Sequence, residues 1–233
     1  MNEETPLLLL PGLLCDAALW TYQRAALADL ADIRIADFHS QDTIAAMAES
    51  VLALAPGRFS LAALSMGGYV ALEVMRRAPE RVVRLALLDT SARADAPEQA
   101  ARRRGLMELA EKGRFKGVTP RLLPLLIHPD RLDEANLVEA VTAMAGRVGQ
   151  DAFLRQQKAI MGRSDSLSDL PRITCPALVV CGRQDALTPL DLSREIFDRL
   201  PEARLAVIED CGHLSAMERP EAVTAELRAW LIG

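Results

Sequence analysis

A serine flanked by small residues lies where an apolar run gives way to a helical pattern. Residues 61–69 read Leu-Ala-Ala-Leu-Ser-Met-Gly-Gly-Tyr, which places Ala63 and Gly67 on either side of Ser65. An abrupt turn from a strand into a helix requires small residues at these positions, and it holds the serine hydroxyl outward as a nucleophile. The N–H of Met66 would then lie at a helix N-terminus, where it can stabilise an anion. The alternative is that Ser65 only caps the helix.

Two side chains suited to proton transfer follow apolar runs in the second half of the chain. They are Asp185 and His213. The chain has three histidines, so few residues can act as a base near neutral pH, and we interpret His39 and His128 as loop or surface residues. Each candidate also has a simpler interpretation. Asp185 suits a turn or a helix cap, and His213 suits a turn packed on the surface.

Serine, aspartate and histidine occur in that order, each after a predicted parallel strand. This order places Ser65, Asp185 and His213 at the carboxyl edge of the sheet, where open α/β sheets bind ligands. There His213 would take the proton of Ser65 and return it to a leaving group. Asp185 would orient the imidazole and stabilise its cation. Together the three residues favour nucleophilic catalysis more strongly than any of them does alone.

Such chemistry needs a second donor for the negative charge that develops on the substrate oxygen. The first predicted strand ends in a tight turn at Pro11-Gly12, and the N–H of Leu13 is the natural candidate to act beside that of Met66. Loss of one such donor typically costs about 2.7–4 kcal/mol of transition-state stabilisation. The alternative is an ordinary turn at the end of a strand.

Six short apolar runs predict strands that alternate with helical patterns, which is typical of a parallel sheet covered by helices. Several runs are apolar almost throughout, as expected for strands buried on both faces. The predicted strands are Leu7–Leu10, Ile33–Phe38, Phe59–Leu64, Val82–Leu88, Ala177–Cys181 and Leu205–Ile208. The predicted helices run from Asp16 to about Leu30 and over Thr43–Leu54, Gly67–Ala78, Pro189–Leu200 and Pro220–Leu231.

The interval from Thr90 to Cys175 contains helical patterns and no convincing strand. They cover Pro97–Glu111, Thr119–Ile127, Leu132–Val148 and Asp151–Met161. A long helical insertion at one connection of a parallel sheet is usually a lid. We therefore expect a single domain over residues 1–233 with a lid at 90–165. The alternative is a helical layer that completes the core, which we favour for the last helix because the next strand needs a crossover helix.

Composition excludes several classes of protein. The 233 residues are half apolar and carry a net charge of −5. The chain is too apolar to be disordered, lacks the basic block of a nucleic-acid binder, and lacks the roughly 18 apolar residues of a membrane span. The acidic N-terminus, Met1–Pro6, is unlike a secretory signal, so we expect a cytoplasmic protein with reduced thiols. The four cysteines lack C-x-x-C spacing, so we expect no metal site.

With these residues in view, the chain resembles the α/β-hydrolase superfamily over essentially its whole length. The similar stretches are Ser65-Met66-Gly67-Gly68, Ala78-Pro79-Glu80-Arg81-Val82, Cys175 to Val180, and Cys211-Gly212-His213 followed by Glu218-Arg219-Pro220-Glu221. The resemblance implies an α/β-hydrolase fold with Ser65, Asp185 and His213 as a catalytic triad. It also implies an oxyanion hole formed by Leu13 and Met66, and no cofactor.

The chain departs from the superfamily pattern at three places. Ala63 replaces the first glycine of the serine turn, and Pro11 stands where many relatives have histidine. The chain also begins at what the superfamily counts as its third strand, so we expect a six-stranded, all-parallel sheet without the usual N-terminal pair. Some relatives carry the acid at the position of Asp89. We prefer Asp185, because Gly182-Arg183-Gln184-Asp185 matches the commoner pattern.

The expected function is hydrolysis of a small carboxylic ester, lactone or thioester through an acyl-enzyme on Ser65. The same triad would also serve a cofactor-free perhydrolase or haloperoxidase, a C–C hydrolase or an acyltransferase, and the fold also occurs in non-catalytic ligand receptors. Some aliphatic residues of the expected lid would line an acyl pocket, although core packing suits most of them individually. They are Met107, Leu122, Leu123, Leu125, Leu126, Ile127, Met144 and Met161. We expect a small-molecule substrate, with no nucleic-acid or membrane partner.

Overall fold

The computed structural model describes residues 5–233 and contains one six-stranded sheet. The acidic residues 1–4, on which part of the expectation about a leader segment rests, lie outside the described residues. The strands are β1 (Leu7–Leu10), β2 (Ile33–Ile35), β3 (Phe59–Leu64), β4 (Val82–Leu88), β5 (Ala177–Gly182) and β6 (Ala203–Ile208). Their order in the sheet is β2-β1-β3-β4-β5-β6, and every strand pair is parallel. The predicted all-parallel sheet is confirmed.

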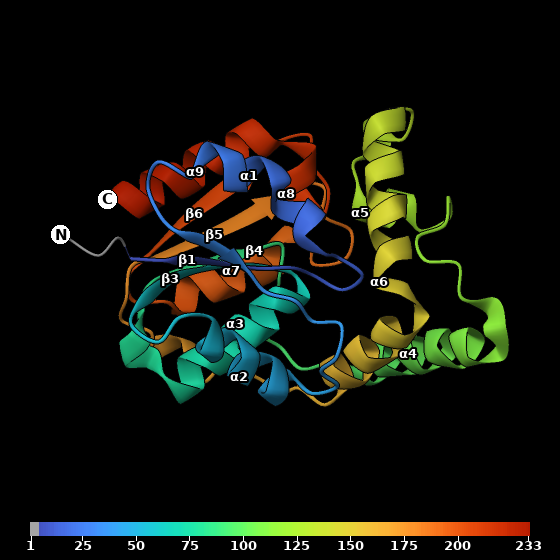
Figure 1. Cartoon of the computed structure of the whole chain (residues 1–233), viewed down its shortest axis with the longest axis horizontal. Coiled ribbons are helices and arrows are strands. Elements are labelled where there is room, and N and C mark those ends of the chain that lie inside the picture. The colour runs from blue at the N-terminus through green and yellow to red at the C-terminus, as the bar shows by residue number, and fades with distance from the viewer. Residues whose placement is uncertain (1–4) are drawn as a thin grey trace.

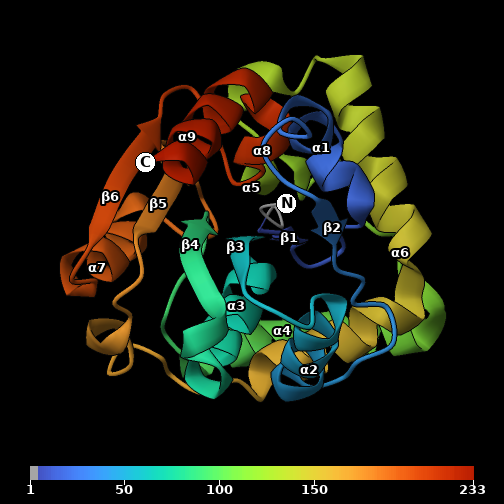
Figure 2. The same ribbon diagram turned by 60° about the vertical axis from the view of Figure 1, so that its left-hand side comes forward.

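Helices cover both faces of this sheet (Figures 1 and 2). Along β1, Leu8 and Leu10 pack into the core on one face, whereas Leu7 and Leu9 pack into the core on the other. The first face is covered by α2 (Ile44–Leu54), α3 (Met66–Arg77) and α7 (Leu190–Arg199). The second face is covered by α1 (Thr21–Ala26), α8 (Ser215–Glu218) and α9 (Pro220–Ile232). Burial on both faces explains why the central strands are apolar throughout.

The connection from β4 to β5 is long and helical, and its helices stand together at one end of the sheet (Figure 1). It contains α4 (Pro97–Leu109), a π-helical turn at Ala110–Arg114, α5 (Leu123–Leu126) and α6 (Ala135–Met161). We call residues 90–165 the helical cap. Its action as a lid stays a prediction.

Two helical boundaries in the cap were predicted wrongly. The helix expected at Thr119–Ile127 is reduced to the four residues of α5, because Pro124 lies in its first turn and Pro129 follows its end. The two helices expected at Leu132–Val148 and Asp151–Met161 form one element, α6, with a kink at Gly149 where φ is 76°. A positive φ is favourable for glycine, so the chain changes direction there without a connecting loop.

The other differences lie near the N-terminus and at the sheet edge. Asp16 caps a helical segment as predicted, but this segment opens as a 3-10 turn at Ala17–Trp20, and α1 ends at Ala26. Strand β2 stops at Ile35 rather than at Phe38, since this edge strand pairs only with β1. No helix among residues 5–233 combines the length and apolar character needed to cross a membrane.

Candidate active site

Ser65 lies in a strained turn between β3 and α3. Its φ of 54° and ψ of −115° are unusual for a residue with a side chain. A Cβ atom on Gly67 would lie 2.5 Å from the carbonyl oxygen of Leu10, and one on Gly68 would lie 2.3 Å from Oγ1 of Thr90. The same Thr90 hydroxyl donates a hydrogen bond to the carbonyl of Ser65 at 2.7 Å. The two glycines therefore let α3 start close against β1, while Thr90 holds the serine turn.

The structure brings the three predicted side chains into one hydrogen-bonded chain. Nε2 of His213 lies 2.9 Å from Oγ of Ser65, and Nδ1 of His213 lies 2.8 Å from Oδ2 of Asp185. The Asp185 carboxylate also accepts the N–H of Leu187 at 2.8 Å, the N–H of Thr188 at 2.9 Å and the Thr188 hydroxyl at 2.7 Å. Asp185 is therefore held from several sides, and it orients the imidazole toward Ser65.

Asp185 and His213 each shift the pKa of the other toward its charged form. Burial alone would raise the pKa of Asp185, but the neighbouring His213 and the hydrogen bonds from His213 and Thr188 hold that pKa below its ordinary value. Burial also acts to lower the pKa of His213. The negative charge of Asp185 outweighs it, so the pKa of His213 lies above 6.5. The geometry thus supplies an ionised carboxylate behind an imidazole of increased basicity.

Two backbone N–H groups are suited to receive a negative charge beside Ser65. Met66 is the first residue of α3, where an N–H has no partner within the helix. The turn after β1 approaches from the other side, since a Cβ atom on Gly12 would lie 3.2 Å from Cβ of Ser65. Leu13 follows in this turn and lines the same cavity as Ser65. Both residues expected to form an oxyanion hole thus lie next to the serine.

A glutamine from the cap holds this turn in place. Leu14 has a φ of 59°, and its N–H donates to Oε1 of Gln156 at 3.0 Å. The Gln156 amide in turn donates to the carbonyl of Phe38 at 3.2 Å, and the glutamine side chain is buried. Gln156 lies on α6, 142 residues from Leu14. The helical cap therefore contributes directly to the position of the Leu13 N–H.

Asp89, the alternative acid, has a different set of partners. It is buried at the end of β4, where one carboxylate oxygen accepts the N–H of Gly182 at 2.8 Å and the other bonds to the hydroxyl of Ser215. Burial and the nearby charge of Asp185 raise the pKa of Asp89 to about 8. The imidazole of His213 bonds to Asp185 instead. Asp89 therefore braces the ends of β4 and β5 rather than the histidine.

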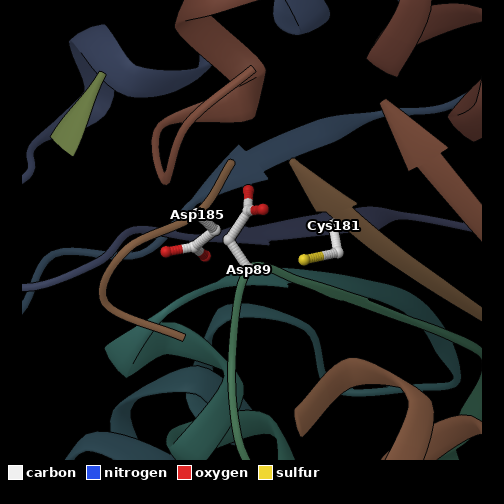
Figure 3. Close-up of side chains that lie close together, drawn as sticks. All are labelled: Asp89, Cys181 and Asp185. Carbon is white, nitrogen blue, oxygen red and sulfur yellow. The ribbon is translucent and has the colours of Figure 1, made fainter. Parts of the chain in front are cut away.

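Asp89, Cys181 and Asp185 lie close together, with donor atoms within 4.8 Å of one another (Figure 3). The grouping has the residue types of a metal site, but its hydrogen bonds do not suit one. The oxygens of both carboxylates already accept hydrogen bonds, and burial raises the pKa of the Cys181 thiol to about 12. These hydrogen bonds tie Asp89 to the end of β5 and Asp185 to His213.

The loop that carries His213 is fastened to the cap. The N–H groups of His213 and Leu214 both donate to the carbonyl of Leu126 at 3.0 Å. One oxygen of the buried Glu218 accepts the N–H of Gly212 at 2.8 Å, and the other accepts the N–H of His128 at 2.6 Å. Burial raises the pKa of Glu218 above its ordinary value, against the effect of these two hydrogen bonds. The glutamate thus joins the histidine loop to the segment after α5.

A cavity of about 450 Å³ opens above Ser65 and His213, beneath the cap. Four of the lid residues singled out from the sequence line it, and they are Leu122, Leu125, Leu126 and Met144. Leu123 and Ile127 are instead buried in the core, as the alternative interpretation expected. The cavity therefore has an aliphatic wall beside the reactive serine, which suits an acyl chain.

The alpha/beta hydrolase family model matches residues 7–227 of the chain. The chain belongs to the alpha/beta hydrolase family. This hydrolase is 29% identical over 189 residues to a pimeloyl-[acyl-carrier protein] methyl ester esterase of Nitrosomonas europaea. The aligned part spans 77% of this chain and 74% of the esterase.

Solved structures extend the likeness to nearly the whole hydrolase. An esterase from Thermogutta terrifontis superposes with a TM-score of 0.89 at 30% identity, over 98% of this chain and 89% of the esterase. An enol-lactonase from Burkholderia xenovorans LB400 superposes with a TM-score of 0.88 at 25% identity, over 98% of this chain and 92% of the lactonase. The family and the fold expected from the resemblance are confirmed.

Proposed function

We propose that this protein is a serine hydrolase that cleaves carboxylic esters of small molecules through an acyl-enzyme on Ser65. The observation that carries the proposal is the 2.9 Å approach of His213 Nε2 to the Ser65 hydroxyl, with Asp185 behind the imidazole. The similarity to an esterase, a methyl ester esterase and an enol-lactonase supports ester or lactone bonds as the target. Thioesters are included because the same acyl transfer applies to them.

The reaction would proceed in two acyl transfers. His213 removes the proton of Ser65 as the hydroxyl oxygen attacks the ester carbonyl, and Asp185 stabilises the resulting imidazolium. The N–H groups of Leu13 and Met66 receive the charge on the carbonyl oxygen. His213 then passes the proton to the leaving alcohol, which leaves the acyl group on Ser65. A water molecule activated by His213 repeats the sequence and releases the acid.

This mechanism uses only side chains, backbone N–H groups and water, so the proposal includes no cofactor and no metal. The substrate would be a small molecule, because the serine faces a cavity of about 450 Å³. We also propose the cytoplasm as the site of action, in keeping with four free cysteines.

The decisive experiment combines covalent labelling with a substrate panel. A fluorophosphonate probe should label the folded protein at Ser65, and p-nitrophenyl esters of short and medium acyl chains should be hydrolysed. Ser65→Ala should abolish labelling and reduce kcat by about 10⁴-fold or more. Absence of an adduct on the folded wild-type protein would contradict the proposal and favour a ligand receptor. Labelling without turnover of any ester, lactone or thioester would overturn the assignment of a hydrolase.

A further inference from the structure

The cavity has a second side whose chemistry differs from the aliphatic wall. This side is formed by the start of the cap, the N-terminal half of α4 and the end of α6. Its charged lining residues are four arginines and two aspartates, an excess of two positive charges. They are Arg93, Arg102, Arg103, Arg163, Asp95 and Asp165. Glu195, outside the lining, pairs with Arg93 at 2.6 Å and reduces the excess to one. The whole chain has a net charge of −5, so this side of the cavity has the opposite sign of charge.

On this side of the cavity, one carboxylate is shared between two guanidinium groups. Asp95 lies 2.7 Å from Nε of Arg103 and 2.9 Å from Nη1 of Arg163. The Asp95 and Arg163 side chains are only 4% and 6% exposed, and Arg103 is 21% exposed. Two cations against one anion leave a net positive charge in a poorly hydrated place. Such a charge is costly unless a further anion compensates it.

The two arginines are not equivalent in their remaining contacts. Arg163 is fully engaged, since it donates to the carbonyls of Ile160 and Arg93 and its guanidinium lies 4.1 Å above the ring centre of Tyr69. Arg103 donates through Nε to Asp95 and through Nη1 to Gln157 at 2.9 Å. Its Nη2 group has no hydrogen-bond partner among residues 5–233. Of the two arginines, Arg103 is therefore the one whose guanidinium still has N–H groups free to bind a ligand in the cavity.

A second arginine, Arg102, can also bind an anion in the cavity. Arg102 precedes Arg103 on α4, lines the same cavity, is exposed, and makes no ion pair within the described part of the chain. Next in sequence, Arg104 is also exposed but does not line the cavity. Guanidinium groups bind carboxylates through paired, charge-assisted hydrogen bonds. The cavity that Ser65 lines thus presents both aliphatic and cationic side chains.

We propose that Arg103 and Arg102 form a subsite for a carboxylate carried by the substrate, so that the preferred esters are half-esters of dicarboxylic acids. This inference rests on the proposed function of the same cavity. The aliphatic wall accommodates the methylene chain, the ester carbonyl lies at Ser65, and the free carboxylate meets the two guanidinium groups.

The test compares matched substrates that differ only in charge. Monomethyl glutarate and monomethyl adipate are each paired with the methyl ester of the same length that ends in a neutral carboxamide. The measured quantity is the ratio of kcat/KM for the carboxylate over that for the carboxamide. In the wild type this ratio should be about tenfold or more, and it should fall at high salt.

Three variants locate the effect. Arg103→Gln and Arg102→Gln should each lower the ratio several-fold, whereas Arg104→Gln should leave it at the wild-type value. Arg102→Gln breaks no side-chain hydrogen bond or ion pair among residues 5–233, so it keeps the test valid even where Arg103→Gln disturbs Asp95. A ratio near one in the wild type, or a ratio unaffected by Arg102→Gln and Arg103→Gln, would overturn the subsite while hydrolysis of the carboxamide esters upholds the hydrolase. If the wild-type protein hydrolyses none of the esters and is not labelled by the fluorophosphonate probe, the proposed function itself is wrong.

Discussion

The carboxylate of Glu218 accepts the backbone N–H of His128 at 2.6 Å, and through this bond the loop of the reactive histidine is joined to the cap. The other oxygen of the same carboxylate accepts the N–H of Gly212, next to His213. A buried carboxylate with two backbone donors fixes both segments at once, because neither N–H makes another hydrogen bond in the described structure.

Replacement of Glu218 by glutamine should therefore loosen the histidine loop. The amide keeps one acceptor oxygen but presents an NH₂ group to the second N–H, which is left unsatisfied. We expect a loss of about 1–3 kcal/mol in the free energy of unfolding, measured in urea, and a fall in kcat with little change in KM. The control is Glu221→Gln, which alters an exposed glutamate in the first turn of α9 and should change neither quantity. Equal behaviour of the two variants would show that Glu218 does not position His213.

The two buried aspartates should respond differently to the same substitution. Asp185→Asn removes the charge that stabilises the imidazolium and should reduce kcat by about 10⁴-fold. Burial and the nearby charge of Asp185 raise the pKa of Asp89 and so favour its neutral form, which asparagine resembles in size and shape; Asp89→Asn should therefore cost less than about tenfold. Ester hydrolysis by both variants at pH 7 measures the difference. Nearly normal turnover in Asp185→Asn would assign the acid to Asp89.

The pH dependence of hydrolysis should report His213. The imidazole must be neutral to accept the serine proton, so kcat/KM should fall as the pH decreases through its pKa. Because Asp185 raises this pKa, the inflection should lie above 6.5 in the wild type. Removal of the charge in Asp185→Asn should move the inflection of the residual activity to lower pH. Profiles of kcat/KM from about pH 5 to about pH 9 measure the direction in which the inflection moves. A shift to higher pH in the variant would contradict the role given to Asp185.

The serine turn should tolerate no side chain at Gly67. A Cβ atom there would lie 2.5 Å from the carbonyl oxygen of Leu10, so Gly67→Ala forces α3 away from β1 and should destabilise the fold by about 1–3 kcal/mol. Gly105→Ala provides the matched comparison. Gly105 lies inside α4 with nothing within 4 Å of the new atom, and alanine should stabilise the protein by about 0.5–1 kcal/mol. Urea unfolding of both variants measures these opposite changes.

The central strands were predictable because strands that are buried on both faces are apolar almost throughout, which is visible in the sequence. Leu7–Leu10, Phe59–Leu64 and Val82–Leu88 match the structure residue for residue. The cap was less predictable, since its helices depend on contacts as well as on pattern. Apolar residues at 119–127 resemble a helix, but Pro124 confines the helix to one turn. Gly149 suggests a helix end, yet the chain there only bends.

The positions of Ser65, Asp185 and His213 followed from strand ends alone, because parallel strands deliver their carboxyl ends to one edge. The residues that hold them in place left weaker signals. Thr188 was recognisable in principle, since it lies three residues after Asp185 in the same loop. Gln156 was not, because it lies on α6, 142 residues from the Leu14 N–H that it accepts. Glu218 lies in a stretch that resembles the superfamily, but nothing in the sequence indicates its bond to the N–H of His128, 90 residues away. Only the tertiary fold brings them together.

The kink at Gly149 lets one continuous helix, α6, reach both the cavity and the core of the sheet. Before it, Val141 and Met144 line the cavity. After it, Phe153 and Ile160 line the same cavity, while Ala159 and Ile160 also belong to the core that α2 and α3 cover. The cap is consequently not a detachable module. An exchange of caps between related hydrolases would have to be joined at Gly149, so that the second half of α6 stays with its own core.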